Sequence, residues 1–134
     1  MMSREREQVN PESRPRRTIP GALSLARLRG MVQVTGNRRE VLFHFTIVAA
    51  GLVAFVRARF AERILATPEE FAAEFRDDIA RLRSIVEAAA TSRELWLRSR
   101  HGTWRFFRIV ADRLVEISRE GLIIPRNDGG QASR

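Results

Sequence analysis

The chain has 134 residues, a formal net charge of +8, 44% hydrophobic residues and no cysteine. This length is sufficient for one domain with its own core, and the absence of cysteine excludes disulfides and thiolate metal centres. Every basic residue is arginine, which also excludes any mechanism that requires a lysine amine. No apolar segment follows the first methionine, so we expect no secretory signal and a cytoplasmic location.

Both ends of the chain are polar and lack apolar periodicity. We predict that residues 1–18 form a disordered basic arm, that residues 19–125 form a single globular domain, and that residues 126–134 form a disordered tail. The arm contains the sequence RPRR, which suits phosphate contacts, although a short basic run is more often a solvated tail.

The first predicted element lies in GALSLARLRGM, residues 21–31, where Leu25, Leu28 and Met31 recur at steps of three. This spacing predicts a short helix that ends near Gly30. The sequence TGNRR at residues 35–39 then predicts a turn, because glycine and asparagine tolerate positive φ.

The stretch from Val41 to Phe60 is strongly apolar, so it is either a membrane-spanning helix or a pair of buried strands. A helix over residues 41–56 would span about 24 Å, which is shorter than the ~30 Å hydrocarbon core of a bilayer. Polar and apolar residues alternate at both ends of the stretch, and a period of two is typical of strands. We therefore predict strands at about 41–48 and 52–60, joined by a tight turn and covered by helices on both faces.

Thr67, Pro68 and Glu70 form the start signal of the next helix: an N-cap, a proline at the first helical position and a capping box. Beyond them, apolar residues recur at steps of four and three, which predicts one apolar stripe packed on a sheet. The members of this stripe are Phe71, Phe75, Ile79, Leu82, Val86 and Ala89. We predict a single helix that runs to about residue 90.

In the rest of the domain, alternating residues and turn signals predict strands in SRELWLRS, WRFFRIV and LVEIS, with turns at RHGT and ADR. The order of elements is therefore helix, strand, strand, helix, strand, strand, strand. The simplest fold with this order is α+β, with a single mixed sheet of about five strands and helices packed on it.

Common enzyme motifs are absent: the sequence has no G-x-S-x-G, no glycine-rich phosphate loop with lysine and no H-E-x-x-H. We interpret His44 as a satisfied residue within a strand and His101 as part of a turn, in preference to a catalytic pair. Asp77 and Asp78 are adjacent, so they point in different directions from a helix, and we expect them on its solvated face. We therefore predict no catalytic residue, no metal site and no cofactor.

Charge is distributed unevenly along the predicted domain. Residues 68–90 carry six acids and three arginines, whereas the rest of residues 19–125 carries fourteen arginines and six acids. Such segregation favours a polyanionic partner, and a solvated arginine-rich surface is the alternative. The candidate nucleic-acid-binding residues on or beside the predicted strands are Arg57, Arg59, Arg98, Arg100, Arg105 and Arg108. The aromatic residues of the same region, which either stack on bases or fill the core, are Trp96, Trp104, Phe106 and Phe107.

The segment FHFTIVAAGLVAFVRAR, residues 43–59, resembles the core of the restriction-endonuclease-like or Holliday-junction-resolvase-like proteins. In that family a helix leads to a strand that carries an aspartate, the next strand carries E-x-K, and a helix and further strands follow. His44 lies at the aspartate position, Arg57 at the glutamate position and Arg59 at the lysine position. The resemblance covers residues 22–118 in outline. It implies an inactive relative with a basic DNA-facing surface, because both carboxylates that would hold Mg²⁺ are replaced.

We therefore expect a non-catalytic nucleic-acid-binding or nucleic-acid-associated protein, with DNA or RNA as its partner and no membrane role. The alternative is a protein interaction module, either as a homo-oligomer or as a subunit of a complex. A metal-independent nuclease and a single-span membrane protein are the remaining alternatives.

Overall fold

The computed structural model describes residues 17–35 and 41–126. Within these residues the chain forms three helices and six strands, and all six strands belong to one mixed sheet. The predicted fold class is confirmed, with one strand more than expected. Nearly all of the predicted arm and tail lies outside the described residues, whereas Arg17 and Thr18 form the start of the first helix.

The strands lie in the sheet in the order in which they occur in the sequence. They are β2 (Met31–Val34), β3 (Phe45–Ala49), β4 (Leu52–Phe60), β5 (Thr91–Arg98), β6 (Trp104–Val110) and β7 (Arg113–Ile117). Neighbouring strands are antiparallel except β4 and β5, which are parallel. A parallel pair needs a crossover connection, and α2 (Pro68–Glu74) together with α3 (Arg76–Arg83) supplies it.

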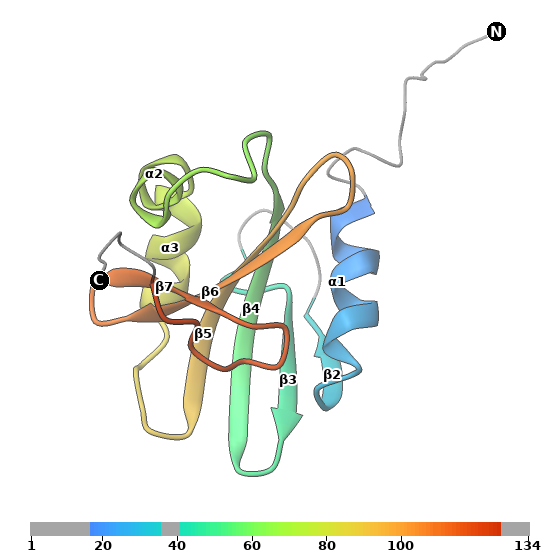
Figure 1. Cartoon of the computed structure of the whole chain (residues 1–134). Coiled ribbons are helices and arrows are strands. Elements are labelled where there is room, and N and C mark those ends of the chain that lie inside the picture. Colours follow the sequence, from blue (N-terminus) through green and yellow to red (C-terminus); the bar gives the residue numbers. More distant parts are fainter. Residues whose placement is uncertain (1–16, 36–40, 127–134) are drawn as a thin grey trace, which may run out of the picture.

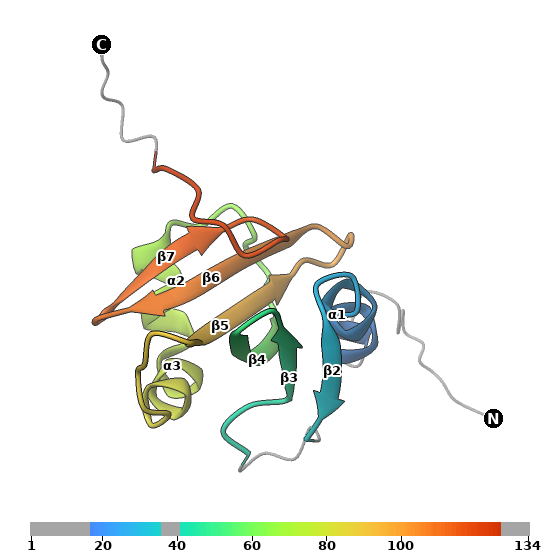
Figure 2. The ribbon, with the colours of Figure 1, turned by 90° about the horizontal axis from the view of Figure 1, so that it is seen from below.

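The molecule has three layers, with α1 (Thr18–Ala26) on one face of the sheet and α2 and α3 on the other, as Figures 1 and 2 show. Each face carries its own apolar core. The core under α1 contains Ala22, Ala26, Phe45, Val56, Trp96 and Phe106. The core under α2 and α3 contains Phe71, Phe75, Leu82, Leu95, Leu97 and Phe107. The prediction that helices cover both faces of the strand pair is correct for β4, which contributes residues to the core under α1 and is bonded to α3 on its other face.

The apolar stretch forms a β-hairpin, as predicted, although its first strand begins at Phe45 and not at residue 41. Its two strands pair in register from Phe45 opposite Val56 to Ala49 opposite Leu52. Gly51 in the turn has a φ of 74°, a conformation that glycine adopts at little cost. Among residues 17–35 and 41–126, no helix is long and apolar enough to cross a membrane.

Strand β2 was not predicted from the sequence. It has only four residues, so its alternation is too short to be distinguished from a loop. Gly30 precedes it at a point where the chain passes very close to β3: a Cβ at this position would collide with the carbonyl oxygen of Val48. The absence of a side chain therefore lets β2 pair beside β3.

The single helix predicted to run to residue 90 is wrong. Phe75 leaves the helical conformation, with φ −106° and ψ 36°, and separates α2 from α3. Helix α3 ends at Arg83, because Thr91 must pair with Val53 at the start of β5. Seven more helical residues would carry the chain about 10 Å further along the helix axis instead of back to the sheet. Val86, a member of the predicted stripe, is 79% exposed as a result.

Candidate functional site

Asp78 lies at the centre of a charged cluster between β4 and α3. The alternation of β4 places Arg57 and Arg59 on the same face of the sheet. Nε of Arg57 donates to Oδ1 of Asp78 at 2.8 Å, and Nη1 of Arg59 donates to Oδ2 at 2.7 Å. Asp78 is only 4% exposed, so the expectation that it lies on a solvated helix face is wrong, whereas Asp77 is exposed. Asp78 can be buried because two guanidinium groups neutralise its carboxylate.

His44 is buried beside this cluster. Its Nδ1 accepts a hydrogen bond from the backbone N–H of Ala58 at 3.0 Å, which agrees with the interpretation of a satisfied residue. Burial, followed by the positive charge of Arg57, lowers the pKa of His44 to about 4. The imidazole is therefore neutral at physiological pH, and Nδ1 is its unprotonated nitrogen.

A small pocket of about 180 Å³ opens above the cluster, and its lining includes Arg59, Glu74, Arg76, Asp77 and Asp78. The side chain of Arg59 is 46% exposed here and its guanidinium lies 5.6 Å from the ring centre of Phe75. Both oxygens of Asp78 already accept hydrogen bonds from arginine. In the part of the chain that the structure describes, no group of three or more His, Cys, Asp or Glu residues is placed to hold a metal ion.

A second charged cluster surrounds Glu94 on the opposite face of the sheet. Arg29, in the turn after α1, donates to both carboxylate oxygens at 2.8 and 3.1 Å. Ser92 and Trp96 donate at 2.7 and 2.9 Å. Burial alone would raise the pKa of Glu94, but the hydrogen bonds and charge of Arg29, assisted by those of Ser92 and Trp96, hold this pKa below its ordinary value. The cluster attaches the end of α1 to the sheet, and sequence reasoning missed it.

Five of the six predicted nucleic-acid-binding arginines have partners within the fold, and one of them, Arg98, donates from Nη1 to the carbonyl oxygen of Ser99 at 3.4 Å. Arg57 and Arg59 bind Asp78, as described above. Arg105 donates to Glu116 at 2.9 and 2.7 Å and to the carbonyl oxygens of residues 64 and 66. Arg108 donates to the side chain of residue 92 and to the carbonyl oxygen of Gly121. These contacts give Arg57, Arg59, Arg105 and Arg108 structural roles.

The other two arginines, Arg98 and Arg100, lie at the turn between β5 and β6. This turn leans over the N-terminal end of α1, where Figure 1 shows the orange loop beside the blue helix. A Cβ on Gly21 of α1 would lie 3.2 Å from the ring of Trp104 and 3.9 Å from Nε of Arg98. Arg98 is therefore packed against the first turns of α1, and Arg100 is exposed beside it.

Most of the aromatic residues in this region belong to the core. Trp96, Phe106 and Phe107 are buried, and Trp104 is half-buried with its ring stacked on that of Phe106 at 6.0 Å. Of the two interpretations of these residues, core packing is correct for the three buried ones. Trp96, Phe106 and Phe107 are therefore not accessible for stacking on bases.

Comparison of the chain with protein-family models, with curated proteins and with solved structures gives no match in any of the three.

Proposed function

We propose that this chain is a non-catalytic nucleic-acid-binding protein that contacts phosphates through the surface around the start of α1 and the β5–β6 turn. One observation supports this proposal above the others: the fold brings together two segments without a single acidic residue. These segments are residues 17–35, which contain α1 and β2, and residues 95–111, which contain the second half of β5 and all of β6.

Because neither segment contains an acid, the surface that they form together carries positive charge that is not neutralised. Arg17 and Arg100 are exposed, and neither makes a hydrogen bond or ion pair with the described residues. Arg17 is the last residue of the sequence RPRR, so two further arginines immediately precede it at the same end of the chain. The first turn of α1 contains no acid, and its backbone N–H groups carry the positive end of the helix dipole. Phosphate groups are the partners that such a surface suits.

The arrangement of the His44 cluster supports an inactive, nuclease-like relative as part of this proposal. Arg57 and Arg59 lie on β4, and helices and further strands follow, as the resemblance implies, whereas β2 intervenes between α1 and β3 and His44 lies just before β3. The two arginines, which the resemblance puts at the glutamate and lysine positions, bind the carboxylate of Asp78. The partner that we propose is DNA or RNA, and the location that we propose for the protein is the cytoplasm.

The test is fluorescence anisotropy with labelled single-stranded and double-stranded oligonucleotides across a salt series. We expect dissociation constants of about 1 μM or tighter at about 50 mM salt, with binding lost at several hundred millimolar because several phosphates are contacted. The double substitution Arg17→Ala/Arg100→Ala should weaken binding by roughly 10-fold and lower the salt slope for duplex DNA by about 2.

The matched control is Arg76→Ala/Arg83→Ala, which removes two exposed positive charges from α3 on the opposite face. This variant should bind within about threefold of the unchanged protein, since it keeps the acid-free surface. Equal weakening by both double substitutions would contradict the location of the surface. No binding of any oligonucleotide at about 50 mM salt would contradict the function itself.

A further inference from the structure

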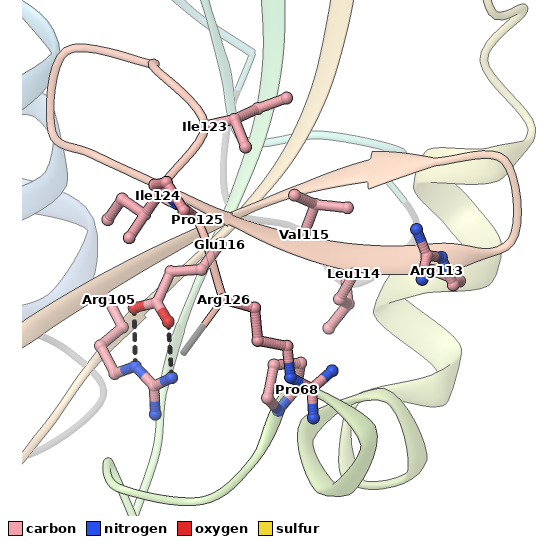
Figure 3. Close-up of a pocket in the computed structure, with 10 residues that line it drawn as sticks. All are labelled: Pro68, Arg105, Arg113, Leu114, Val115, Glu116, Ile123, Ile124, Pro125 and Arg126. Atoms are coloured by element: carbon pink, nitrogen blue, oxygen red, sulfur yellow. Dashed lines mark hydrogen bonds and ion pairs between the residues drawn. The ribbon is translucent and has the colours of Figure 1, made fainter. Parts of the chain in front are cut away.

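A cleft of about 320 Å³ lies between the start of α2, strand β7 and the segment that follows β7 (Figure 3). Its apolar lining comes from Pro68, Leu114, Val115, Ile123, Ile124 and Pro125. Ile123 is 57% exposed and follows Leu122, which is also exposed. Neighbouring exposed apolar side chains at the edge of a cleft are typical of binding surfaces.

The outer edge of β7 is only partly paired. After β7 the chain folds back, and the N–H of Ile124 donates to the carbonyl oxygen of Glu116 at 2.9 Å. This bond shows that Glu116 directs its backbone groups outward. Leu114, two residues earlier, therefore directs its own N–H and C=O outward as well. Pro125 has no N–H to continue the pairing, and no other described segment bonds to this part of the edge.

Among the charged residues that line the cleft, Arg113 is the one without an ion-pair partner in the described part of the chain. Arg105 and Glu116 neutralise each other through the two bonds drawn in Figure 3. Arg126 forms an ion pair with Glu69 at 2.6 Å. Arg113, at the start of β7, is exposed and makes no ion pair with the described residues. A ligand carboxylate near Arg113 would complete the charge balance.

We propose that this cleft binds an extended acidic peptide segment of a partner protein, which adds a strand to β7 opposite Leu114 and directs a carboxylate to Arg113. The unpaired N–H and C=O of Leu114 supply main-chain hydrogen bonds to such a strand. Because side chains alternate along it, every second residue faces the apolar wall formed by Ile123 and Ile124. This interaction does not depend on nucleic-acid binding, which uses the other face of the sheet.

The probe for this site is a fluorescein-labelled hexapeptide of alternating glutamate and valine, with binding followed by anisotropy. Three competitors separate the contributions: the same peptide N-methylated at alternate backbone positions, a version with arginine in place of glutamate, and octanoate. We expect the acidic peptide to bind below about 1 mM and the other two peptides to bind at least roughly 10-fold more weakly. We also expect the amide of Leu114 to exchange more slowly with solvent in the complex.

Two charge reversals of equal size locate the site. Arg113→Glu should weaken binding of the acidic peptide by roughly 10-fold. Arg119→Glu, in the exposed turn after β7 and outside the cleft, should change it by less than about threefold. Equal effects of both reversals, or no binding of the acidic peptide at about 1 mM, would overturn the proposal. Equal binding of the N-methylated peptide, or full displacement by octanoate, would show a pocket for small apolar anions without strand addition.

Discussion

The carboxylate of Asp78 on α3 accepts a hydrogen bond from Nε of Arg57 on β4 at 2.8 Å, and both side chains are almost fully buried. This pair connects the crossover helices to the centre of the sheet. Removing one partner leaves the other charge buried without compensation, which costs more than the intact pair contributes. The pair is therefore a sensitive point of the fold.

Asp78→Ala should lower the free energy of unfolding by about 3–5 kcal/mol, because Arg57 then remains buried without a counter-ion. Urea denaturation followed by circular dichroism measures this change. Asp77→Ala is the matched control: Asp77 is the exposed neighbour on the same helix, and its loss should change stability by less than about 0.5 kcal/mol. Equal effects of the two substitutions would show that Asp78 is not buried as described.

The apolar stripe of the crossover helices gives a second contrast. Phe71 is fully buried and packs against Phe107 with ring centres 5.5 Å apart, whereas Val86 is 79% exposed. Phe71→Ala should therefore destabilise the protein by about 3–5 kcal/mol, and Val86→Ala by less than about 0.5 kcal/mol. Thermal and urea unfolding measure both. A substantial cost for Val86→Ala would support the longer helix that the sequence predicted.

The lowered pKa of His44 predicts a pH dependence of stability. The folded-state pKa is about 4, below the ordinary value of 6.5 for histidine, so the unfolded chain binds the proton more readily. Stability from this group is present above about pH 6.5 and is lost as the pH falls toward 4. The free energy of unfolding should fall by about 2 kcal/mol between pH 7 and pH 4.5 because of this group. Most carboxylates are still ionised over the upper part of that range, so they contribute little to the change there.

His44→Asn is the control for this prediction, because its side-chain oxygen can accept the N–H of Ala58 but does not titrate. The variant should show a flatter profile of unfolding free energy between pH 7 and pH 5 than the unchanged protein. Parallel profiles for the two proteins would mean that His44 is not the group responsible.

The sequence predicted the elements whose signals are local. The hairpin at residues 41–60 alternates at its ends, and the capping box at Thr67 forms as expected, with Thr67 and Glu70 each bonded to the backbone of the other. The break at Phe75 and the end of α3 depend on where the chain must rejoin the sheet, which no local pattern encodes. Strand β2 likewise depends on pairing with β3, since four residues carry too little periodicity.

The two charged clusters also differ in whether the local sequence indicates them. Asp78 interrupts an apolar stripe between Phe75 and Leu82, and Arg57 interrupts an apolar strand, so the two residues together indicate a buried pair that sequence reasoning could have found. Arg29 and Glu94 are 65 positions apart, and nothing in the local sequence connects them. On a sheet covered on both faces, arginines within strands need internal partners, and those near strand ends can reach solvent. This explains why Arg57 and Arg105 bind within the fold whereas Arg100 is exposed.

The resemblance to nucleases leads to a final prediction about Mg²⁺. Supercoiled plasmid DNA incubated with the protein and Mg²⁺ should remain intact, because both oxygens of Asp78 are occupied by Arg57 and Arg59 and neither arginine can bind a cation. Gel electrophoresis over several hours measures nicking and linearisation. Arg59→Ala is the control variant, since Arg59 is the half-exposed member of the cluster that reaches the pocket above it. Nicking that Arg59→Ala leaves unchanged would indicate a contaminating nuclease. Mg²⁺-dependent cleavage by the unchanged protein that Arg59→Ala abolishes would show that the cluster is catalytic, and the proposal of an inactive relative would then be wrong.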